Sequence, residues 1–464
     1  MQNNFKFSEF LKETYSEFDK YGSNSALISI CKELPNLELI DIYEKFLNEY
    51  SFSAFWEEKN SISYIALDKC KYINLDGPNR FELAKNFNQE NFKNLINLST
   101  ENHESSLARI LYFFSFSDES NKKSEGEVDA MEAVLPKILI IKDSQRVWLR
   151  INSQITDKSR LRDIIEEFWD LRHQIVNRKE NVNKTFFKKQ NIQDFYFQFE
   201  KSYEKIRTRI LNGIKIIKDG KVDKIVLAAR INLKIKEELD LINILRSFRD
   251  KQPNTCRYVW KRHKKDITFG ASPEKLFSYN NKILCLEAIA GTSARKNDSN
   301  FLLKSRKNIK EHNFVIEYLL DCLRILKIYK YRSTKLKVIE FGDIAHLHTQ
   351  LTCDVNKICP FKLLEILHPS PAVCGFPKEP ATKWIDTLEN FSRNNYASPI
   401  GWVDSNDNAH FIVAIRGVRN IGDRLEFTAG AGLINDSDCE TEVEEIKIKF
   451  EVLAYPILLS KINQ

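Results

Sequence analysis

Residues 256–291 read CRYVWKRHKKDITFGASPEKLFSYNNKILCLEAIAG, and their apolar runs indicate a sheet built from neighbouring hairpins. Residues 256–260, 267–271 and 282–290 carry short apolar runs bounded by polar residues, which predicts strands. Asn280 and Asn281 predict a turn before the last strand, because asparagine tolerates the left-handed backbone of tight hairpins. The basic run 261–265 predicts a solvated hairpin tip, and a phosphate-binding patch is the alternative.

The rest of residues 194–464 alternates helices and strands. Phe199, Tyr203, Ile206 and Ile210 fall at steps of three and four residues, which predicts an amphipathic helix from about 194 to 220. Further strands are predicted at 222–227, 336–341, 345–353, 399–403, 409–417 and 424–430, and further helices at 240–248, 300–327, 361–367, 381–391 and 439–453. Strands clustered in hairpins favour an α+β fold over a doubly wound parallel sheet.

Composition excludes several classes of protein. The chain has 464 residues, of which 42% are hydrophobic and 29% charged, so it is not a disordered chain. A net charge of +7, spread along the chain, allows an anionic ligand without demanding nucleic acid. Nine cysteines without a CxxC pair indicate reduced thiols. The first residues lack an apolar signal core and no apolar run is long enough to span a bilayer, so we expect a cytoplasmic protein with no membrane partner.

The chain divides by composition into two parts. Residues 178–193 are rich in Asn, Lys and Gln and mark the expected boundary, and residues 101–128 are expected to contain a long surface loop. Residues 1–190 carry no motif, whereas nine of the 14 glycines lie beyond position 260. Because glycine marks tight turns and close approach of the backbone, we expect the functional site in the second part.

Charged and histidine side chains near these glycines are the candidate functional residues. Glu274 follows a Ser-Pro turn, where it either caps the turn or acts chemically. Glu442, Glu445 and Lys449 share one face of the last predicted helix, where a surface ion pair is the alternative to a ligand site. The run 346–348 places two histidines on one strand face, either as a metal pair or bonded within the core. The motifs GxxxxGK[ST], HExxH and GxSxG are absent.

Taken together and in order, these segments resemble the chorismate-utilising enzymes. The resemblance covers about 195–455 and rests on Lys224-Ile-Val-Leu-Ala-Ala-Arg230, Phe269-Gly-Ala-Ser-Pro-Glu274, Ala288-Ile-Ala-Gly-Thr292, Glu311-His312, His346-Leu-His-Thr349, Leu367-His-Pro-Ser-Pro-Ala-Val373, Ser398-Pro-Ile-Gly-Trp402, Val413-Ala-Ile-Arg416, Ala429-Gly-Ala-Gly432 and Glu442-Val-Glu-Glu445 with Lys449. It implies large antiparallel sheets packed face to face with helices on the outside. It also implies a catalytic domain over 191–464, a divergent region over 1–190 packed into the same sandwich, and a monomer acting on the small molecule chorismate.

The resemblance also implies a role for each matching residue. Lys224 is the expected base, taking a proton from water that attacks ring C2, and Glu274 is the expected acid, protonating the hydroxyl that leaves from C4. Glu311 and Glu445, with Glu442 nearby, are the expected Mg²⁺ ligands. The expected substrate-binding residues are Gly291, Thr292, His346, Thr349, Ala372, Val373, Arg416, Gly430 and Lys449. A non-catalytic protein that kept the fold is disfavoured, because these acids and bases are intact.

Within the family, the sequence is similar to the isochorismate synthase branch. Lysine at position 224 is typical of enzymes that use water, whereas the ammonia-using anthranilate and aminodeoxychorismate synthases often carry glutamine there. Ala290 lies where some aminodeoxychorismate synthases carry lysine. A salicylate synthase, which also eliminates pyruvate, is the nearest alternative. The product could serve menaquinone or phylloquinone, siderophore or salicylate pathways, and departures from the usual pattern leave fine specificity open at Ser370, Cys374, Ala397 and Ser398.

Overall fold

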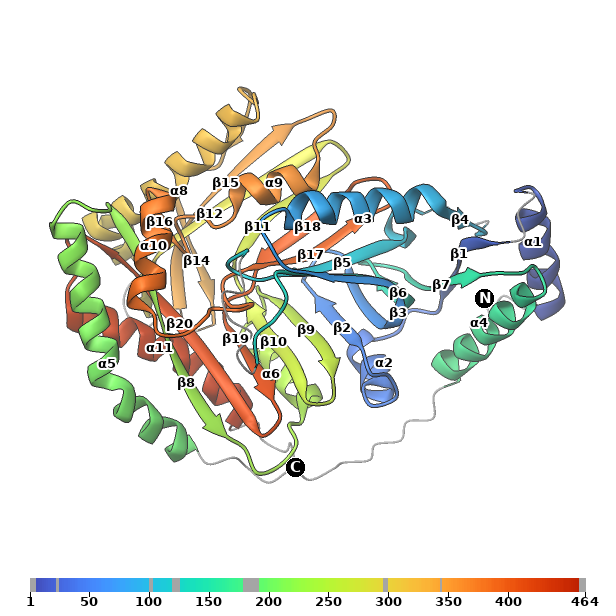
Figure 1. The fold of residues 1–464 in the computed structure, drawn as a ribbon, viewed down its shortest axis with the longest axis horizontal. Helices are drawn as coiled ribbons and strands as arrows, with labels where there is room; N and C mark the ends of the chain where they lie inside the picture. Colours follow the sequence, from blue (N-terminus) through green and yellow to red (C-terminus); the bar gives the residue numbers. More distant parts are fainter. Residues whose placement is uncertain are drawn as a thin grey trace.

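The computed structural model describes residues 6–21, 25–99, 103–118, 126–177, 192–294, 299–342 and 344–458. In these ranges the strands join into one continuous, mostly antiparallel sheet that curves into facing layers, with the helices on the outside (Figure 1). The α+β expectation is therefore confirmed. One pair, β1 with β4, runs parallel within the described part of the chain.

The elements have the following bounds. The helices are α1 (Phe7–Asp19), α2 (Leu39–Phe46), α3 (Arg80–Asn94), α4 (Arg160–Val176), α5 (Ile192–Lys218), α6 (Leu241–Lys251), α7 (Ser299–Lys304), α8 (Arg306–Ile325), α9 (Pro360–Leu367), α10 (Lys378–Leu388) and α11 (Cys439–Leu458), with a 3-10 turn at Glu104–Ser106. The strands are β1 (Ala26–Leu34), β2 (Ser53–Glu57), β3 (Ser63–Leu75), β4 (Leu95–Asn97), β5 (Arg109–Phe114), β6 (Met131–Lys142), β7 (Val147–Ile155), β8 (Lys224–Lys234), β9 (Cys256–His263), β10 (Asp266–Ser272), β11 (Lys275–Asn280), β12 (Ile283–Ala294), β13 (Arg332–Ser333), β14 (Lys337–Phe341), β15 (Ile344–Asp354), β16 (Gly375–Phe376), β17 (Pro399–Asp404), β18 (Ala409–Val413), β19 (Gly417–Ile421) and β20 (Arg424–Ile434).

The stretch 256–291 forms the predicted hairpins with one additional strand. β9 pairs with β10, and β11, which the sequence analysis does not separate, pairs with β12. The second hairpin turns at Asn281 and Lys282, with φ of 49° and 68°, one residue later than expected. The basic tip is solvated only in part: Lys261 is 1% exposed, its ammonium donating to the carbonyl of Tyr50 (2.9 Å), because the pleat turns it toward the core.

The two parts of the chain share backbone hydrogen bonds. β2 pairs with β9, and β5 pairs with β17, so strands from both parts belong to one sheet. The expected boundary at 190–191 lies outside the described residues. Within the range 101–128, Glu104–Ser106 form the 3-10 turn and Arg109–Phe114 form the buried strand β5, while 119–125, where the loop is expected, lie outside the described residues.

The strands nearest the candidate site differ from the sequence expectations in two places. The strand predicted at 424–430 continues through Gly432 to Ile434 as β20, which is paired with β8 along its whole length. The strand expected at 409–417 is interrupted, because Arg416 adopts a φ of 50° between β18 and β19. A residue in the left-handed region breaks the extended backbone of a strand.

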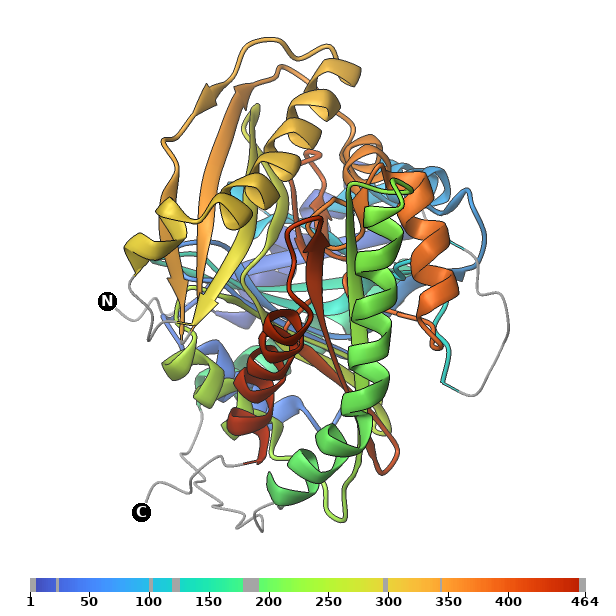
Figure 2. The ribbon, with the colours of Figure 1, turned by 90° about the vertical axis from the view of Figure 1, so that its left-hand side faces the viewer.

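Three helices position the site from outside (Figure 2). α5 and α11 lie side by side over β8 and β20, and α8 packs on β12 and β15. The helix expected at 300–327 is two helices, because Ser305 begins a new one: its hydroxyl accepts a hydrogen bond from the Asn308 N–H (3.4 Å). Asp240, where the helix predicted at 240–248 begins, caps α6 by accepting a hydrogen bond from the Asn243 N–H.

The structure also describes the state of the cysteines and the length and apolar character of the helices. All nine cysteines are free thiols. Within the described ranges, no helix has both the length and the apolar character needed to cross a bilayer.

Candidate active site

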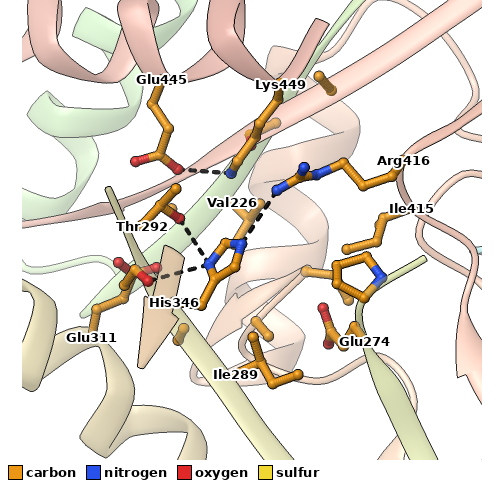
Figure 3. A pocket seen from close by; sticks show the side chains of 18 of the residues that line it. Val226, Glu274, Ile289, Thr292, Glu311, His346, Ile415, Arg416, Glu445 and Lys449 are labelled. Carbon is orange, nitrogen blue, oxygen red and sulfur yellow. Dashed lines mark hydrogen bonds and ion pairs between the residues drawn. The ribbon is translucent and has the colours of Figure 1, made fainter. Parts of the chain in front are cut away.

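A cleft of about 690 Å³ lies between the β8–β20 layer, β12, β15 and the helices α8 and α11 (Figure 3). The lining residues are Val226, Pro273, Glu274, Ile289, Ala290, Gly291, Thr292, Glu311, His346, Ala372, Val373, Tyr396, Ile415, Arg416, Thr428, Ala429, Gly430, Gly432, Glu445 and Lys449. The cleft thus gathers residues from most of the motifs in the second part of the chain.

Glu274 presents a buried carboxyl group at the junction of β10 and β11. Its backbone is held at both ends: its N–H donates to Ser272 Oγ (3.2 Å), and its carbonyl accepts from the Val413 N–H (3.0 Å). The residue is 8% exposed. Burial raises its pKa from 4.5 to about 7, although nearby cations oppose the shift. The group is therefore suited to donate a proton near neutral pH.

Two cations and a neutral histidine form another wall of the cleft. Arg416 Nη2 donates to His346 Nε2 (3.3 Å), and because arginine can only donate, the ring proton is assigned to Nδ1, which faces the carbonyl of Gly291 (3.2 Å). Burial, with help from Arg416 and Lys449, holds the pKa of His346 well below its ordinary value. Lys449 Nζ donates to the carbonyl of Gly430 (2.7 Å) and pairs with Glu445 (2.7 Å).

Lys224 lies at the start of β8, is wholly buried and is not among the residues that line the cleft. Its ammonium is 3.0 Å from Glu311 Oε1, an ion pair whose angles fall short of a hydrogen bond. A Cβ at position 432 would lie 2.4 Å from that carboxylate oxygen and 3.2 Å from the Lys224 Cε. A side chain at position 432 would therefore force the Glu311 carboxylate, and with it the ion pair between β8 and α8, to shift.

Three carboxylates supply the oxygen ligands that Mg²⁺ prefers. The Oε2 of Glu442 is buried without a hydrogen-bond partner, which suits a ligand position. Within the described ranges, no group of three His, Cys, Asp or Glu side chains is arranged to hold an ion. Instead, each carboxylate pairs with a lysine: Glu311 with Lys224, Glu442 with Lys307, and Glu445 with Lys449. The donor chemistry thus fits the expected metal, and the ligand assignment stays a prediction.

Two glycines bring the backbone close to the cleft. Gly291 has a φ of 76° and lies at a bulge in the β12–β15 pairing, where a Cβ would be 3.0 Å from Asn308 Cβ. At Gly430 a Cβ would be 2.9 Å from the carbonyl oxygen of Leu227. Any side chain at either position would collide with its neighbour or occupy the cleft.

Three of the expected site residues do not line the cleft. Lys224 and Glu442 are buried in their ion pairs, and Thr349 is buried with its hydroxyl on His312 Nε2 (2.9 Å). Sequence reasoning missed several lining residues, above all the partly buried Tyr396 and the buried Thr428. Thr428 precedes the quoted run 429–432, so alternation along β20 was the signal that could have found it.

A buried ion pair that the sequence analysis did not identify holds one wall. Arg393 pairs with Glu389 (2.5 Å) and also donates to the carbonyls of Val373 and Val226 (2.7 Å each). Glu389 in turn accepts from the Ala228 N–H (2.7 Å). The pair therefore fixes the Ala372–Val373 loop against β8, since both partners are satisfied by several hydrogen bonds.

The sequence matches a protein-family model and is similar to curated proteins of known name. A family model described as chorismate binding enzyme matches residues 10–457. The vibriobactin-specific isochorismate synthase of Vibrio cholerae is 28% identical over 264 residues, which cover 54% of this chain and 66% of that protein. The isochorismate synthase MenF of Bacillus subtilis is 32% identical over 254 residues, 51% of each chain. The chain thus aligns with about half to two thirds of the length of these curated relatives.

Solved structures show the same fold over most of the chain. The menaquinone-specific isochorismate synthase MenF from Escherichia coli has a TM-score of 0.74 at 19% identity, covering 96% of this chain and 99% of that one. Anthranilate synthase component I from Streptococcus pneumoniae has a TM-score of 0.67 at 18% identity, covering 86% and 93%. Because the family model spans nearly all of the described residues, the chain belongs to the chorismate binding enzyme family.

Proposed function

We propose that the protein is an isochorismate synthase, which converts chorismate to isochorismate. Water adds its oxygen at ring C2, the ring double bonds shift, and the C4 hydroxyl leaves with a proton, so the product is an isomer of the substrate. The observation that carries the proposal is the buried Glu274 in the same cleft as the cations Arg416 and Lys449. An acid that is protonated near neutral pH is what the loss of a hydroxyl requires.

The cations of the cleft suit the two carboxylates of chorismate. Arg416 can form two parallel hydrogen bonds to one carboxylate, because its guanidinium has a planar fork of donors. Within the described residues its side chain makes one hydrogen bond, to His346, which leaves other donors for a ligand. Lys449 adds a point charge between Gly430 and Glu445.

Lys224 is the proposed base for the attacking water. Its positive charge opposes the effect of burial on the pKa of Glu274, so the two groups are electrostatically close although they lie on different strands. The base must be neutral when it accepts the proton. Glu311 and Glu445, with Glu442 nearby, would hold a Mg²⁺ ion, which when bound neutralises a substrate carboxylate.

The test is product analysis with purified protein, chorismate, Mg²⁺ and ¹⁸O-labelled water. We expect isochorismate carrying one ¹⁸O, measured by chromatography and mass spectrometry. The substitution Lys224→Ala tests the proposed base in the same assay. Its control is Lys221→Ala, because Lys221 is an exposed lysine three residues earlier in the chain. Salicylate with pyruvate as the main product would instead establish a salicylate synthase, and an aminated product formed only with ammonia would establish the other branch. No turnover of chorismate with Mg²⁺ would refute the proposal.

The relatives' names support water as the nucleophile but point to different products downstream. One is named for vibriobactin, one solved structure is menaquinone-specific, and a salicylate biosynthesis isochorismate synthase of Pseudomonas aeruginosa is 28% identical over 259 residues. The monomeric state and the cytoplasmic location stay predictions.

A further inference from the structure

Lys307 is a half-buried lysine in the first turn of α8, and it has no role in the proposed reaction. It lies one helical turn before Glu311, so the two side chains share a helix face. Its ammonium forms an ion pair with Glu442 Oε1 of α11, and its side chain is 23% exposed. The pair joins two helices that each carry an expected metal ligand.

Glu442 depends on this lysine for its charge. The carboxyl is fully buried, and its second oxygen has no hydrogen-bond partner. Burial and the neighbouring Glu445 raise the pKa of Glu442 to about 7, and Lys307 opposes that rise. An isolated buried carboxylate is costly, so some cation must accompany it.

The field of Lys307 extends to the other two carboxylates. Burial lowers its pKa, but Glu442, Glu445 and Glu311 together raise it above the ordinary value, so all three act on it at short range. A divalent cation held by these carboxylates would lie close to the ammonium group. Like charges a few ångströms apart in a partly buried site repel strongly, because solvent screens them poorly.

We propose that Lys307 is the counter-ion that a divalent cation must displace from Glu442, and that it thereby sets the affinity of this site for Mg²⁺. The inference rests on the proposed function only in assigning a metal to these carboxylates. With Lys307 in place, three lysines balance three glutamates. Removing its charge leaves the cluster one negative charge in excess, which favours a cation without creating any new ligand.

Metal affinity without substrate tests the inference. Mn²⁺, a substitute with the same oxygen ligands, is titrated into the full chain by calorimetry and by electron paramagnetic resonance of the free ion. We expect Lys307→Met to bind Mn²⁺ at least about tenfold more tightly than the wild type. The matched control is Lys310→Met, on the same helix, whose ion pair with Asp436 (3.7 Å) is half-exposed. It should leave affinity within about twofold.

A second variant separates displacement from simple repulsion. In a Glu442→Gln background, the substitution Lys307→Met should improve affinity by less than about threefold, because the ion pair is already gone and only the repulsion between the lysine and the metal ion is relieved. A full tenfold gain in that background would overturn the displacement mechanism. Unchanged or weaker binding by Lys307→Met alone would overturn the whole inference and make the lysine only a tie between α8 and α11. Should Lys307→Met fail to fold, Lys307→Gln replaces it with the same expectations.

Chorismate turnover, measured separately, keeps the two proposals distinguishable. A wild type that forms isochorismate while all variants bind Mn²⁺ equally would retain the proposed function and overturn the role of Lys307. Tighter binding by Lys307→Met in a protein that does not turn over chorismate would support the role of Lys307 and overturn the proposed function.

Discussion

Replacing Glu274 by glutamine should make the protein more stable at alkaline pH while removing most of its activity. The carboxyl is 8% exposed, and burial raises its pKa from 4.5 to about 7 against the opposing charges of Lys224, Lys449 and Arg416. The native protein therefore stores an unfavourable buried charge whenever this group ionises. Glutamine has the same shape and cannot ionise, so it removes that cost.

The sign and size of the effect follow from proton linkage. Between pH 4.5 and about 7 the folded state binds more protons at this group than the unfolded state, so the stability it contributes is complete below 4.5 and is lost as pH rises through 7. One pKa unit corresponds to about 1.4 kcal/mol, so the whole loss is roughly 3 kcal/mol. We expect Glu274→Gln to gain about that much over the wild type between pH 4.5 and pH 8.

Urea unfolding at acidic, neutral and alkaline pH measures the stability difference, and chorismate turnover measures activity. Activity should fall by at least about 10²-fold, the usual contribution of a positioned acid. Glu287→Gln is the control of opposite sign: burial raises the pKa of Glu287, but His348 and Lys275 lower it below its ordinary value, so this variant should lose stability at neutral pH. A stability difference for Glu274→Gln that does not change with pH would refute the reasoning.

Three further predictions concern single residues. Lys224→Ala should lower kcat by at least about 10²-fold and change chorismate affinity much less; a variant that still formed isochorismate from water would contradict its role as base. Gly432→Ala should weaken Mg²⁺ binding and activity together, because the new Cβ would lie 2.4 Å from Glu311 Oε1; wild-type Mn²⁺ affinity would show that the carboxylate can move aside freely. Burial lowers the pKa of His410 from 6.5 to about 4, so the protein should lose stability as pH falls through this interval, and His410→Gln should reduce the slope seen in urea unfolding. An unchanged slope would exclude this histidine as a source of acid sensitivity.

The sequence predicted the features that depend on local patterns. Helix and strand periodicity located α5, α6, α11 and the hairpins of residues 256–291, because neighbouring residues determine which face is buried. The motifs placed Glu274, Arg416 and Lys449 in one site, because each lies at the end of a strand or on the helix that follows the last strand. Those residues line the cleft as expected.

Features set by distant contacts could not be predicted in this way. The strand predicted to end at 430 continues through Gly432, and the neighbours that a side chain would meet there come from elsewhere in the fold: Leu227 of β8 at Gly430, and Glu311 of α8 at Gly432. Thr349 lies on the strand that carries His346, yet its hydroxyl contacts His312 rather than the cleft. Arg393, paired with Glu389, donates hydrogen bonds to the carbonyls of Val226 and Val373. No local sequence pattern predicts such contacts.

The pairings of β2 with β9 and of β5 with β17 also bear on how such a chain can diverge. Backbone N–H and carbonyl groups make these hydrogen bonds, and every residue except proline carries both. Substitutions in the first part of the chain can therefore accumulate without loosening its attachment, provided that each strand keeps its length and apolar face. These backbone hydrogen bonds preserve the architecture of the first part of the chain while its side chains can change in evolution.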